Sequence, residues 1–162
     1  MSENWVINAS PVILLAKVGL IGFVPSIVSS LVIPQPVVEE ITSIRNDAAS
    51  EWVHGNGRSF IQPAVAELKE LASTEIGGGE RSVISWALAH PGFVAVLDDR
   101  EARNIAQRLG VKVIGTVGVV LRLKKAGSIS EVKPHLLKIR EIGGYIGEGL
   151  FREALLRAGE QP

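Results

Sequence analysis

Oxygen-bearing side chains recur where predicted strands end or where the helices after them begin. They are Asn8, Ser10, Glu40, Glu80, Asp98 and Asp99. Carboxylates that converge without a Lys or Arg partner repel one another unless protons or a cation intervene. Mg²⁺ prefers hard oxygen ligands, and such an ion can activate water and stabilise a phosphoryl oxyanion. If the fold brings these side chains together, they predict a divalent metal site.

The elements that would position these side chains are clearest around the aspartate pair 98–99. Residues 93–97 form a short apolar run, which is typical of a strand buried on both faces. Apolar side chains at helical spacing predict a helix over residues 100–109, which Gly110 ends, and residues 111–115 return as a strand. This strand–helix–strand unit implies a parallel sheet, whose ligands bind beyond the carboxyl ends of the strands. The aspartate pair lies at that edge.

The rest of the chain predicts further short strands and helices. The other strands are expected at residues 5–7, 31–33 and 59–62, and the helices at 12–21, 36–50, 64–73, 80–89, 117–127, 134–142 and 147–158. Ser10 and Thr116 are expected to cap helices, Ile44 to be buried with Val37, Val38 and Ile41, and Gly77–Gly79 to form a flexible loop. If the first and fourth strands are neighbours, Asn8 and Ser10 lie against Asp98 and Asp99.

Composition limits the kinds of protein that this chain can be. Its 162 residues are 46% hydrophobic, enough for a single domain over residues 1–162 with a three-layer core. It has no cysteine, which excludes disulfides and thiolate metal sites, and its three histidines lack metal-motif spacing. Because no apolar stretch reaches membrane-spanning length and the start lacks a signal-peptide pattern, we expect no membrane association and a soluble, cytoplasmic protein.

Charge is distributed unevenly although the formal total is zero. Residues 1–99 hold 5 Lys/Arg and 11 Asp/Glu, a formal charge of −6, and residues 100–162 carry +6. The basic half could attract the phosphates of a nucleic acid, while solvated helix faces explain the same charges equally well. The candidate phosphate contacts are Arg100, Arg103, Arg122, Lys124, Lys125, Lys133, Lys138 and Arg140.

Several segments, taken together and in order, resemble the PIN domain, the fold of VapC-type toxins and related metal-dependent ribonucleases. They are VINASPVILLAKVG, IPQPVVEEI, GGGERSVISWALAH, VLDDREARNIAQRLGVKVIGTVGVVLRLKKAG and the basic C-terminal helices. The likeness is strongest to PIN-like proteins described only as predicted to bind nucleic acid. The resemblance implies an α/β protein with a three-layer α/β/α fold, a mostly parallel sheet of about five strands, and an acidic quartet that binds Mg²⁺ or Mn²⁺.

Carried over position by position, the quartet falls on Asn8, Glu40, Glu80 and Asp99. The resemblance implies that Asn8, Glu40, Glu80, Asp98 and Asp99 bind the metal. It makes Glu40, Glu80 and Asp99 the catalytic residues, and Ser10 matches a hydroxyl residue that supports the site. The chain departs from the family pattern at Asn8, where a typical PIN nuclease has aspartate. An amide oxygen can contact a metal, but it brings no negative charge and cannot act as a base.

Each of these residues also has a purely structural interpretation. Asp98 or Asp99 could cap the next helix, with Glu101 completing a capping box for Asp98. Glu40 could lie on a solvated helix face, and Glu80 could interact only with the positive end of its helix. Asn8 and Ser10 could shape a turn.

Three functions remain in competition. The leading hypothesis is a ribonuclease that acts on RNA, with an antitoxin protein and a second copy of the chain as further candidate partners. Val117, Val120 and Leu121 form an apolar ridge that could serve dimerisation or pack in the core. The second is a PIN-like module that binds nucleic acid or protein without chemistry, which Asn8 favours. The third is a nucleotide-binding module that uses Gly77–Gly79.

Overall fold

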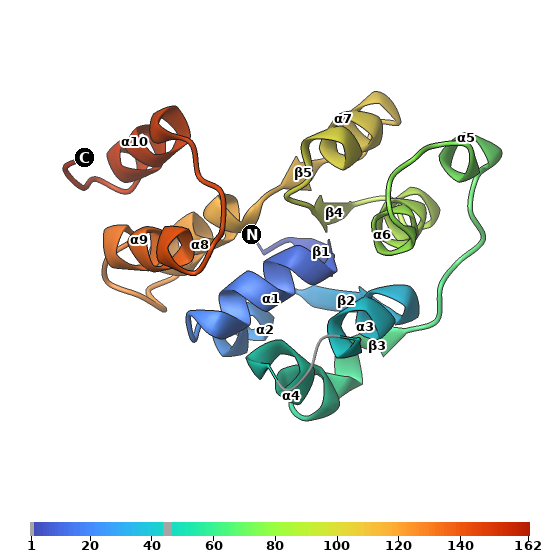
Figure 1. Cartoon of the computed structure of the whole chain (residues 1–162), viewed down its shortest axis with the longest axis horizontal. Coiled ribbons are helices and arrows are strands. Elements are labelled where there is room, and N and C mark those ends of the chain that lie inside the picture. Colours follow the sequence, from blue (N-terminus) through green and yellow to red (C-terminus); the bar gives the residue numbers. More distant parts are fainter. Residues whose placement is uncertain (1, 44–46) are drawn as a thin grey trace.

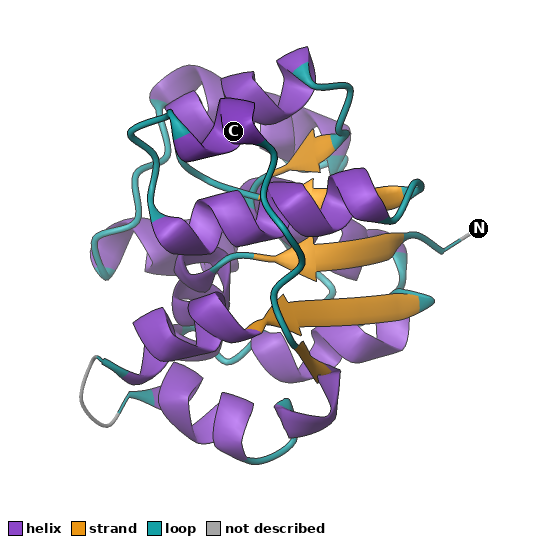
Figure 2. Cartoon of the chain, turned by 90° about the vertical axis from the view of Figure 1, so that its right-hand side faces the viewer, coloured by secondary structure: helices purple, strands orange, loops and turns teal. Residues whose placement is uncertain are grey.

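The computed structural model describes residues 2–43 and 47–162. Within them, five parallel strands form one sheet in the order β3-β2-β1-β4-β5 (Figure 2). The strands are β1 (Asn4–Ile7), β2 (Ser30–Pro34), β3 (Ile61–Gln62), β4 (Phe93–Val96) and β5 (Val113–Ile114). The expected sheet of about five strands is therefore confirmed, and the described strands are all parallel.

Helices cover both faces of this sheet, which makes three layers. They are α1 (Ala9–Lys17), α2 (Val24–Ile27), α3 (Gln35–Thr42), α4 (Ala48–His54), α5 (Lys69–Ala72), α6 (Gly78–Ala89), α7 (Arg100–Arg108), α8 (Thr116–Lys125), α9 (Lys133–Glu141) and α10 (Glu148–Arg157), with 3-10 turns η1 (Ile21–Phe23) and η2 (Arg58–Phe60). Figure 1 shows α6 and α7 on one side of the sheet and α1 and α8 on the other. In the described ranges no single helix is long and apolar enough to cross a membrane; only α1 with the η1–α2 segment, bent by 112°, reaches that length and composition together.

The central strands β1 and β4 pair along their whole length. Asn4 lies opposite Phe93 and Ile7 opposite Val96, and the Asn8 N–H extends the ladder by donating to the Val96 carbonyl at 3.1 Å. The chain leaves β1 toward β2 and leaves β4 toward β5, so the connections diverge at this point. A switch of this kind opens a crevice at the carboxyl edge of a parallel sheet. The expectation that the first and fourth strands are adjacent in the sheet is confirmed.

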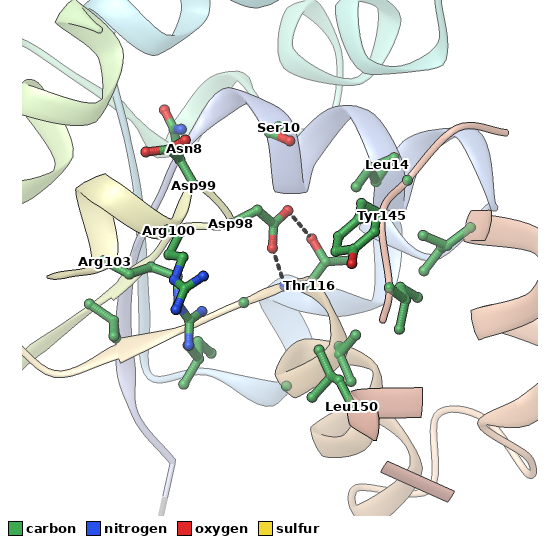
Figure 3. A pocket seen from close by; sticks show the side chains of 18 of the residues that line it. Asn8, Ser10, Leu14, Asp98, Asp99, Arg100, Arg103, Thr116, Tyr145 and Leu150 are labelled. Carbon is green, nitrogen blue, oxygen red and sulfur yellow. Dashed lines mark hydrogen bonds between the residues drawn. The ribbon is translucent and has the colours of Figure 1, made fainter. Parts of the chain in front are cut away.

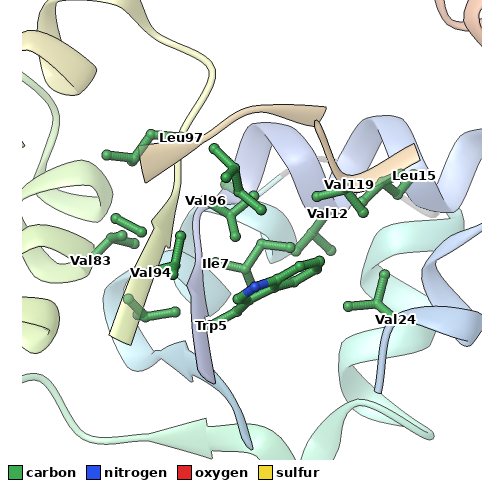
Figure 4. Packing of buried hydrophobic residues seen from close by; sticks show 14 of the residues in the cluster. Trp5, Ile7, Val12, Leu15, Val24, Val83, Val94, Val96, Leu97 and Val119 are labelled. Carbon is green, nitrogen blue, oxygen red and sulfur yellow. The ribbon is translucent and has the colours of Figure 1, made fainter. Parts of the chain in front are cut away.

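The core fills both spaces between the sheet and its helices. Trp5 and Ile7 of β1 lie beside Val12 and Val24, whereas Val83 of α6 lies near β4 (Figure 4). These side chains are buried, and burying an aliphatic side chain of this size contributes about 1.5–3 kcal/mol.

The ridge on α8 belongs to this core. Val117 and Val120 are buried, and Leu121 is partly buried against the same cluster. The core interpretation of the ridge is therefore the correct one, and a dimer contact would need another surface.

Some predicted boundaries were wrong for identifiable reasons. The helix predicted over residues 36–50 is two helices, because Asp47 caps a new one: its side chain accepts a hydrogen bond from the Ser50 N–H at 2.9 Å. The predicted burial of Ile44 falls outside the described residues. The helix predicted over 64–73 is reduced to α5, and the strand predicted over 59–62 is reduced to β3 because η2 occupies its first half.

Two expected helix caps were also displaced by one or two residues. Asn8, not Ser10, occupies the N-cap position of α1, although without a side-chain hydrogen bond, and Ser10 lies exposed in the first turn. Gly115, not Thr116, is the N-cap of α8.

Glu3 links the start of β1 to two distant elements and should make stability depend on pH. Its carboxylate accepts hydrogen bonds from Arg122 at 2.8 Å, Lys112 at 3.1 Å and the Trp5 indole at 3.2 Å. Burial alone would raise the pKa of Glu3, but these hydrogen bonds lower it from 4.5 to about 2. A lowered pKa means that the stabilisation is complete above about pH 4.5 and is lost as the pH falls toward 2.

We therefore expect Glu3→Gln to lower the free energy of unfolding by about 1–3 kcal/mol at pH 7, and the difference from wild type to shrink between pH 4.5 and 2. Urea unfolding across that range measures it. Glu141→Gln is the control, since Glu141 forms only an exposed ion pair with Lys138 at 3.9 Å. A constant difference at all pH values would contradict the assignment.

Candidate acidic site

An open cleft of about 1410 Å³ lies at the carboxyl edge of the sheet. All the oxygen-bearing side chains predicted from the sequence line it: Asn8, Ser10, Glu40, Glu80, Asp98 and Asp99. They come from α1 and the residue before it, α3, α6 and the β4–α7 junction, so the fold alone brings them together. Figure 3 shows Asn8 and Asp99 close together, Asp98 turned toward Thr116, and Ser10 on α1 nearby.

The glycine cluster fixes two of the carboxylates. Gly79 donates its backbone N–H to Glu40 Oε1 at 2.9 Å, and Gly77 donates to Glu80 Oε1 at 3.0 Å. Gly78 and Gly79 form the first turn of α6, so the prediction of a flexible loop was wrong. Because the chain's own carboxylates already use two of these N–H groups, the cluster is poorly suited to cradle a nucleotide phosphate.

Two buried oxygens of the site have no hydrogen-bond partner among the described residues. They are Asn8 Oδ1 and Glu80 Oε2, and the Asn8 side chain belongs to a residue only 5% exposed. Buried polar atoms in proteins are nearly always hydrogen-bonded, so two unpaired acceptors in one cleft indicate a place for a cation or a proton donor.

The carboxylates of the cleft repel one another. Burial raises the pKa of Glu80, the Gly77 N–H partly opposes this, and the negative charges of Asp99, Glu40 and Glu101 raise it further. Within residues 2–43 and 47–162, none of Glu40, Glu80 and Asp99 forms an ion pair that would relieve the repulsion. The site therefore favours a bound cation electrostatically.

The two adjacent aspartates have different structural partners. Asp99 Oδ2 accepts a hydrogen bond from the Ala102 N–H at 2.9 Å and so caps α7. Asp98 instead accepts from the backbone N–H of Thr116 at 2.7 Å and from its hydroxyl at 2.6 Å, which ties the end of β4 to the start of α8 (Figure 3). The capping interpretation is thus correct for Asp99 and wrong for Asp98. Both oxygens of Asp98 are engaged, whereas Asp99 uses only one as the cap.

These donors fit an ion that keeps most of its water ligands. Among the residues that the structure describes, no three Asp, Glu, His or Cys side chains approach closely enough to form a ready-made ligand set. Mg²⁺ is commonly held by one or two direct carboxylates with several waters, and it dehydrates reluctantly. Glu40, Glu80, Asp99 and the Asn8 amide oxygen are of the right chemical type for such a loosely filled site.

The predicted phosphate-binding residues divide into two groups. Arg100 and Arg103 line the cleft (Figure 3), and Arg103 also donates to the Leu97 carbonyl at 3.0 Å. Arg122 also lines the cleft, although its Nε is paired with Glu3 at 2.8 Å. Lys124 is paired with Glu160 at 2.8 Å. Lys124 and Lys125 are not part of the cleft lining.

Sequence reasoning missed the contribution of the C-terminal segment. Tyr145, Leu150 and Arg157 line the cleft opposite the acids, from α10 and the loop before it. The glycines on both sides of Tyr145 were the available signal, because they mark a tight turn in which a lone aromatic has no core position.

A pair of alanine substitutions on α6 tests the contact between Gly79 and Glu40. A Cβ atom at Gly79 would lie 2.5 Å from Glu40 Oε1, so Gly79→Ala must displace that carboxylate. At Gly78 the nearest atom to an added Cβ is Arg81 Nη2 at 3.6 Å, an ordinary contact. We expect Gly79→Ala to weaken Mn²⁺ binding about 10-fold or more and Gly78→Ala to leave it unchanged. Titration calorimetry measures both, and equal affinities would exclude Glu40 from the site.

Comparison with protein-family profiles identifies a family for this chain. A family profile described as a PIN domain matches residues 4–160. A search of curated proteins finds no match. PIN domains have a nuclease-like fold, generally bind nucleic acid and generally depend on divalent metal ions. The match includes every strand of the sheet and every residue of the acidic cleft, and the chain therefore belongs to the PIN domain family.

Proposed function

We propose that this protein is a Mg²⁺- or Mn²⁺-dependent ribonuclease that hydrolyses phosphodiester bonds in RNA. The observation that supports it best is the convergence of Glu40, Glu80 and Asp99 in one cleft, beside the unpaired amide oxygen of Asn8. A divalent ion bound by these oxygens would activate water and stabilise negative charge on a phosphoryl oxygen.

The side chains of the cleft have distinct roles in this proposal. Glu40 and Asp99 each use one oxygen for a backbone N–H and offer the other to the ion. Glu80 Oε2 has no hydrogen-bond partner among the described residues, and burial and neighbouring negative charges raise the pKa of this carboxyl, so we propose that Glu80 accepts the proton of the attacking water. Asn8 supplies a neutral ligand. Asp98 is reassigned from direct ligand to support, because Thr116 engages both of its oxygens.

The remaining parts of the proposal concern substrate, partners and location. Arg100 and Arg103 hold the phosphates of the RNA strand beside the acids, and Ser10 supports the site from the first turn of α1. The chain acts as a single domain in the cytoplasm. An antitoxin protein and a second copy of the chain are further partners, to be sought by co-purification and sedimentation.

The direct test is cleavage of a single-stranded RNA with Mn²⁺ and with a chelator, together with calorimetric titration of Mn²⁺ into the RNA-free protein. We expect metal-dependent cleavage and a measurable binding heat, and loss of cleavage in Glu80→Gln. Cleavage that persists unchanged in the chelator, or in Glu80→Gln, would contradict the proposal.

A binding module without chemistry is the second candidate, and Asn8 is the observation that favours it. With an amide in place of one carboxylate, the cleft has less negative charge with which to hold a cation. Salt-dependent RNA binding without turnover in Mn²⁺ would support this alternative, and absence of binding at low salt would exclude it.

A further inference from the structure

Tyr145 is the most exposed large apolar side chain among the described residues. It is the only tyrosine of the chain and is 95% exposed, yet it lines the same cleft as the acids (Figure 3). Leu150, also exposed, lies in the same lining. An aromatic ring with both faces accessible gives up the stabilisation that burial would provide, so its place in a charged cleft indicates a contact with something outside the chain.

The backbone on both sides of Tyr145 is fixed, although the ring itself is free of contacts that would bury it. Before it, the Gly144 N–H donates to the Ile139 carbonyl at 2.9 Å, and an added Cβ at Gly144 would lie only 2.5 Å from Ile139 Cγ2. After it, Arg140 Nε donates to the Ile146 carbonyl at 3.1 Å, and the Ile146 side chain is buried. The ring therefore projects from an anchored turn, which lowers the entropy cost of using it as a contact.

The chemistry around the ring identifies the kind of ligand. Arg100 and Arg103 supply positive charge for phosphates in the same cleft, and Glu40, Glu80 and Asp99 form its acidic end. A ligand that combines phosphates with flat, exposed rings is a single-stranded nucleic acid, whose bases stack on aromatic side chains. In a duplex the bases are already stacked on one another and cannot reach the tyrosine ring.

We propose that Tyr145 is a stacking platform for an unpaired base of the RNA substrate, and that it sets a preference for single strands over duplexes. This inference rests on the proposed function, since it places the strand across the cleft with its backbone toward the arginines. Tyr145 would contact a base and not the scissile phosphate, so it affects binding of the strand more than the bond-breaking step.

The test compares Tyr145→Ala and Tyr145→Phe for binding to a short fluorescent single-stranded RNA in a chelator, where cleavage does not proceed. We expect Tyr145→Ala to weaken binding roughly 5- to 100-fold and Tyr145→Phe to bind within about twofold of wild type. Duplex RNA of the same sequence should bind equally to all three proteins. A 2-aminopurine base in the strand should lose fluorescence on wild type and Tyr145→Phe but not on Tyr145→Ala.

Unchanged single-strand binding in Tyr145→Ala would overturn the inference, as would an equal loss for duplex and single strand. Loss of a homodimer in Tyr145→Ala, with RNA binding intact, would also overturn it and assign the ring to a contact between copies. Tyrosine-dependent binding without cleavage in Mn²⁺ would support the stacking role while refuting the ribonuclease. Cleavage in Mn²⁺ combined with single-strand binding that is unchanged in Tyr145→Ala would refute the stacking role alone.

Discussion

Asp99→Asn should reduce metal-dependent RNA cleavage about 10- to 100-fold while leaving the fold intact. Asparagine is as good an N-cap as aspartate, so its side-chain oxygen can still accept the Ala102 N–H that Asp99 Oδ2 accepts at 2.9 Å. The substitution therefore removes one negative charge from the cleft and little else. Single-turnover cleavage in Mn²⁺ measures the rate, and urea unfolding checks that stability is preserved.

The chain provides a matched control for this substitution. Asp47 caps α4 in the same way, with its side chain accepting from Ser50 N–H at 2.9 Å, but it does not line the cleft. Asp47→Asn should retain wild-type cleavage and Mn²⁺ affinity. Equal cleavage by Asp99→Asn and wild type would remove Asp99 from the mechanism.

A readout independent of activity follows from the electrostatics of Glu80. The negative charge of Asp99 is one of the causes that raise the pKa of Glu80. Asp99→Asn should therefore lower that pKa, which carboxyl-carbon NMR titration of metal-free protein can follow. An unchanged Glu80 titration would mean that the two carboxylates do not interact.

Asn8→Asp should destabilise the metal-free protein and strengthen its metal binding. The new carboxylate would replace a residue only 5% exposed, beside the acids of the cleft, so burial and repulsion would raise its pKa above the unfolded value. A raised pKa means that the variant matches wild type at low pH and loses stability as the pH rises through that pKa. We expect a loss of about 1–3 kcal/mol at pH 8 without metal.

Added Mn²⁺ should reverse this loss, because a ligand that binds only the folded state stabilises it by mass action. Urea unfolding at pH 5 and pH 8, with and without Mn²⁺, gives the four values required. Asn104→Asp adds the same charge at an exposed position of α7 and should change none of them. A pH-independent effect of Asn8→Asp would contradict a carboxylate in the acidic cleft.

The functional outcome of Asn8→Asp separates the two candidate functions. If cleavage rises with metal affinity, the wild-type amide limits an otherwise complete nuclease site. If metal affinity rises and no cleavage occurs, the cleft binds ions without supporting hydrolysis, which favours the binding module.

The sheet could be predicted from the sequence because its signals are local. The apolar run before Asp98 and Asp99, the helix that ends at Gly110 and the short return strand each depend on neighbouring residues, and parallel topology then places strand ends at one edge. The same reasoning predicted that Asn8 lies beside Asp98 and Asp99, since β1 and β4 pair directly.

The roles of individual acids could not be predicted because their partners are distant in sequence. Asp98 is bound by Thr116, 18 residues later, and Glu40 is bound by Gly79, 39 residues later. Local capping rules identified a cap at the aspartate pair but had no means of choosing Asp99 over Asp98. Arg122 lines the cleft, but its hydrogen bond to Glu3 could not be predicted because Glu3 lies at the other end of the chain.

The backbone N–H groups of Gly77 and Gly79, which donate hydrogen bonds to Glu80 and Glu40, can report on the acidic cleft by NMR. Glycine amide nitrogens have NMR shifts apart from those of most other residues. The N–H protons of Gly77 and Gly79 are hydrogen-bonded to carboxylates that a bound ion would polarise. Occupancy of the cleft can therefore be followed at two backbone positions in solution, with no label attached and no reaction required.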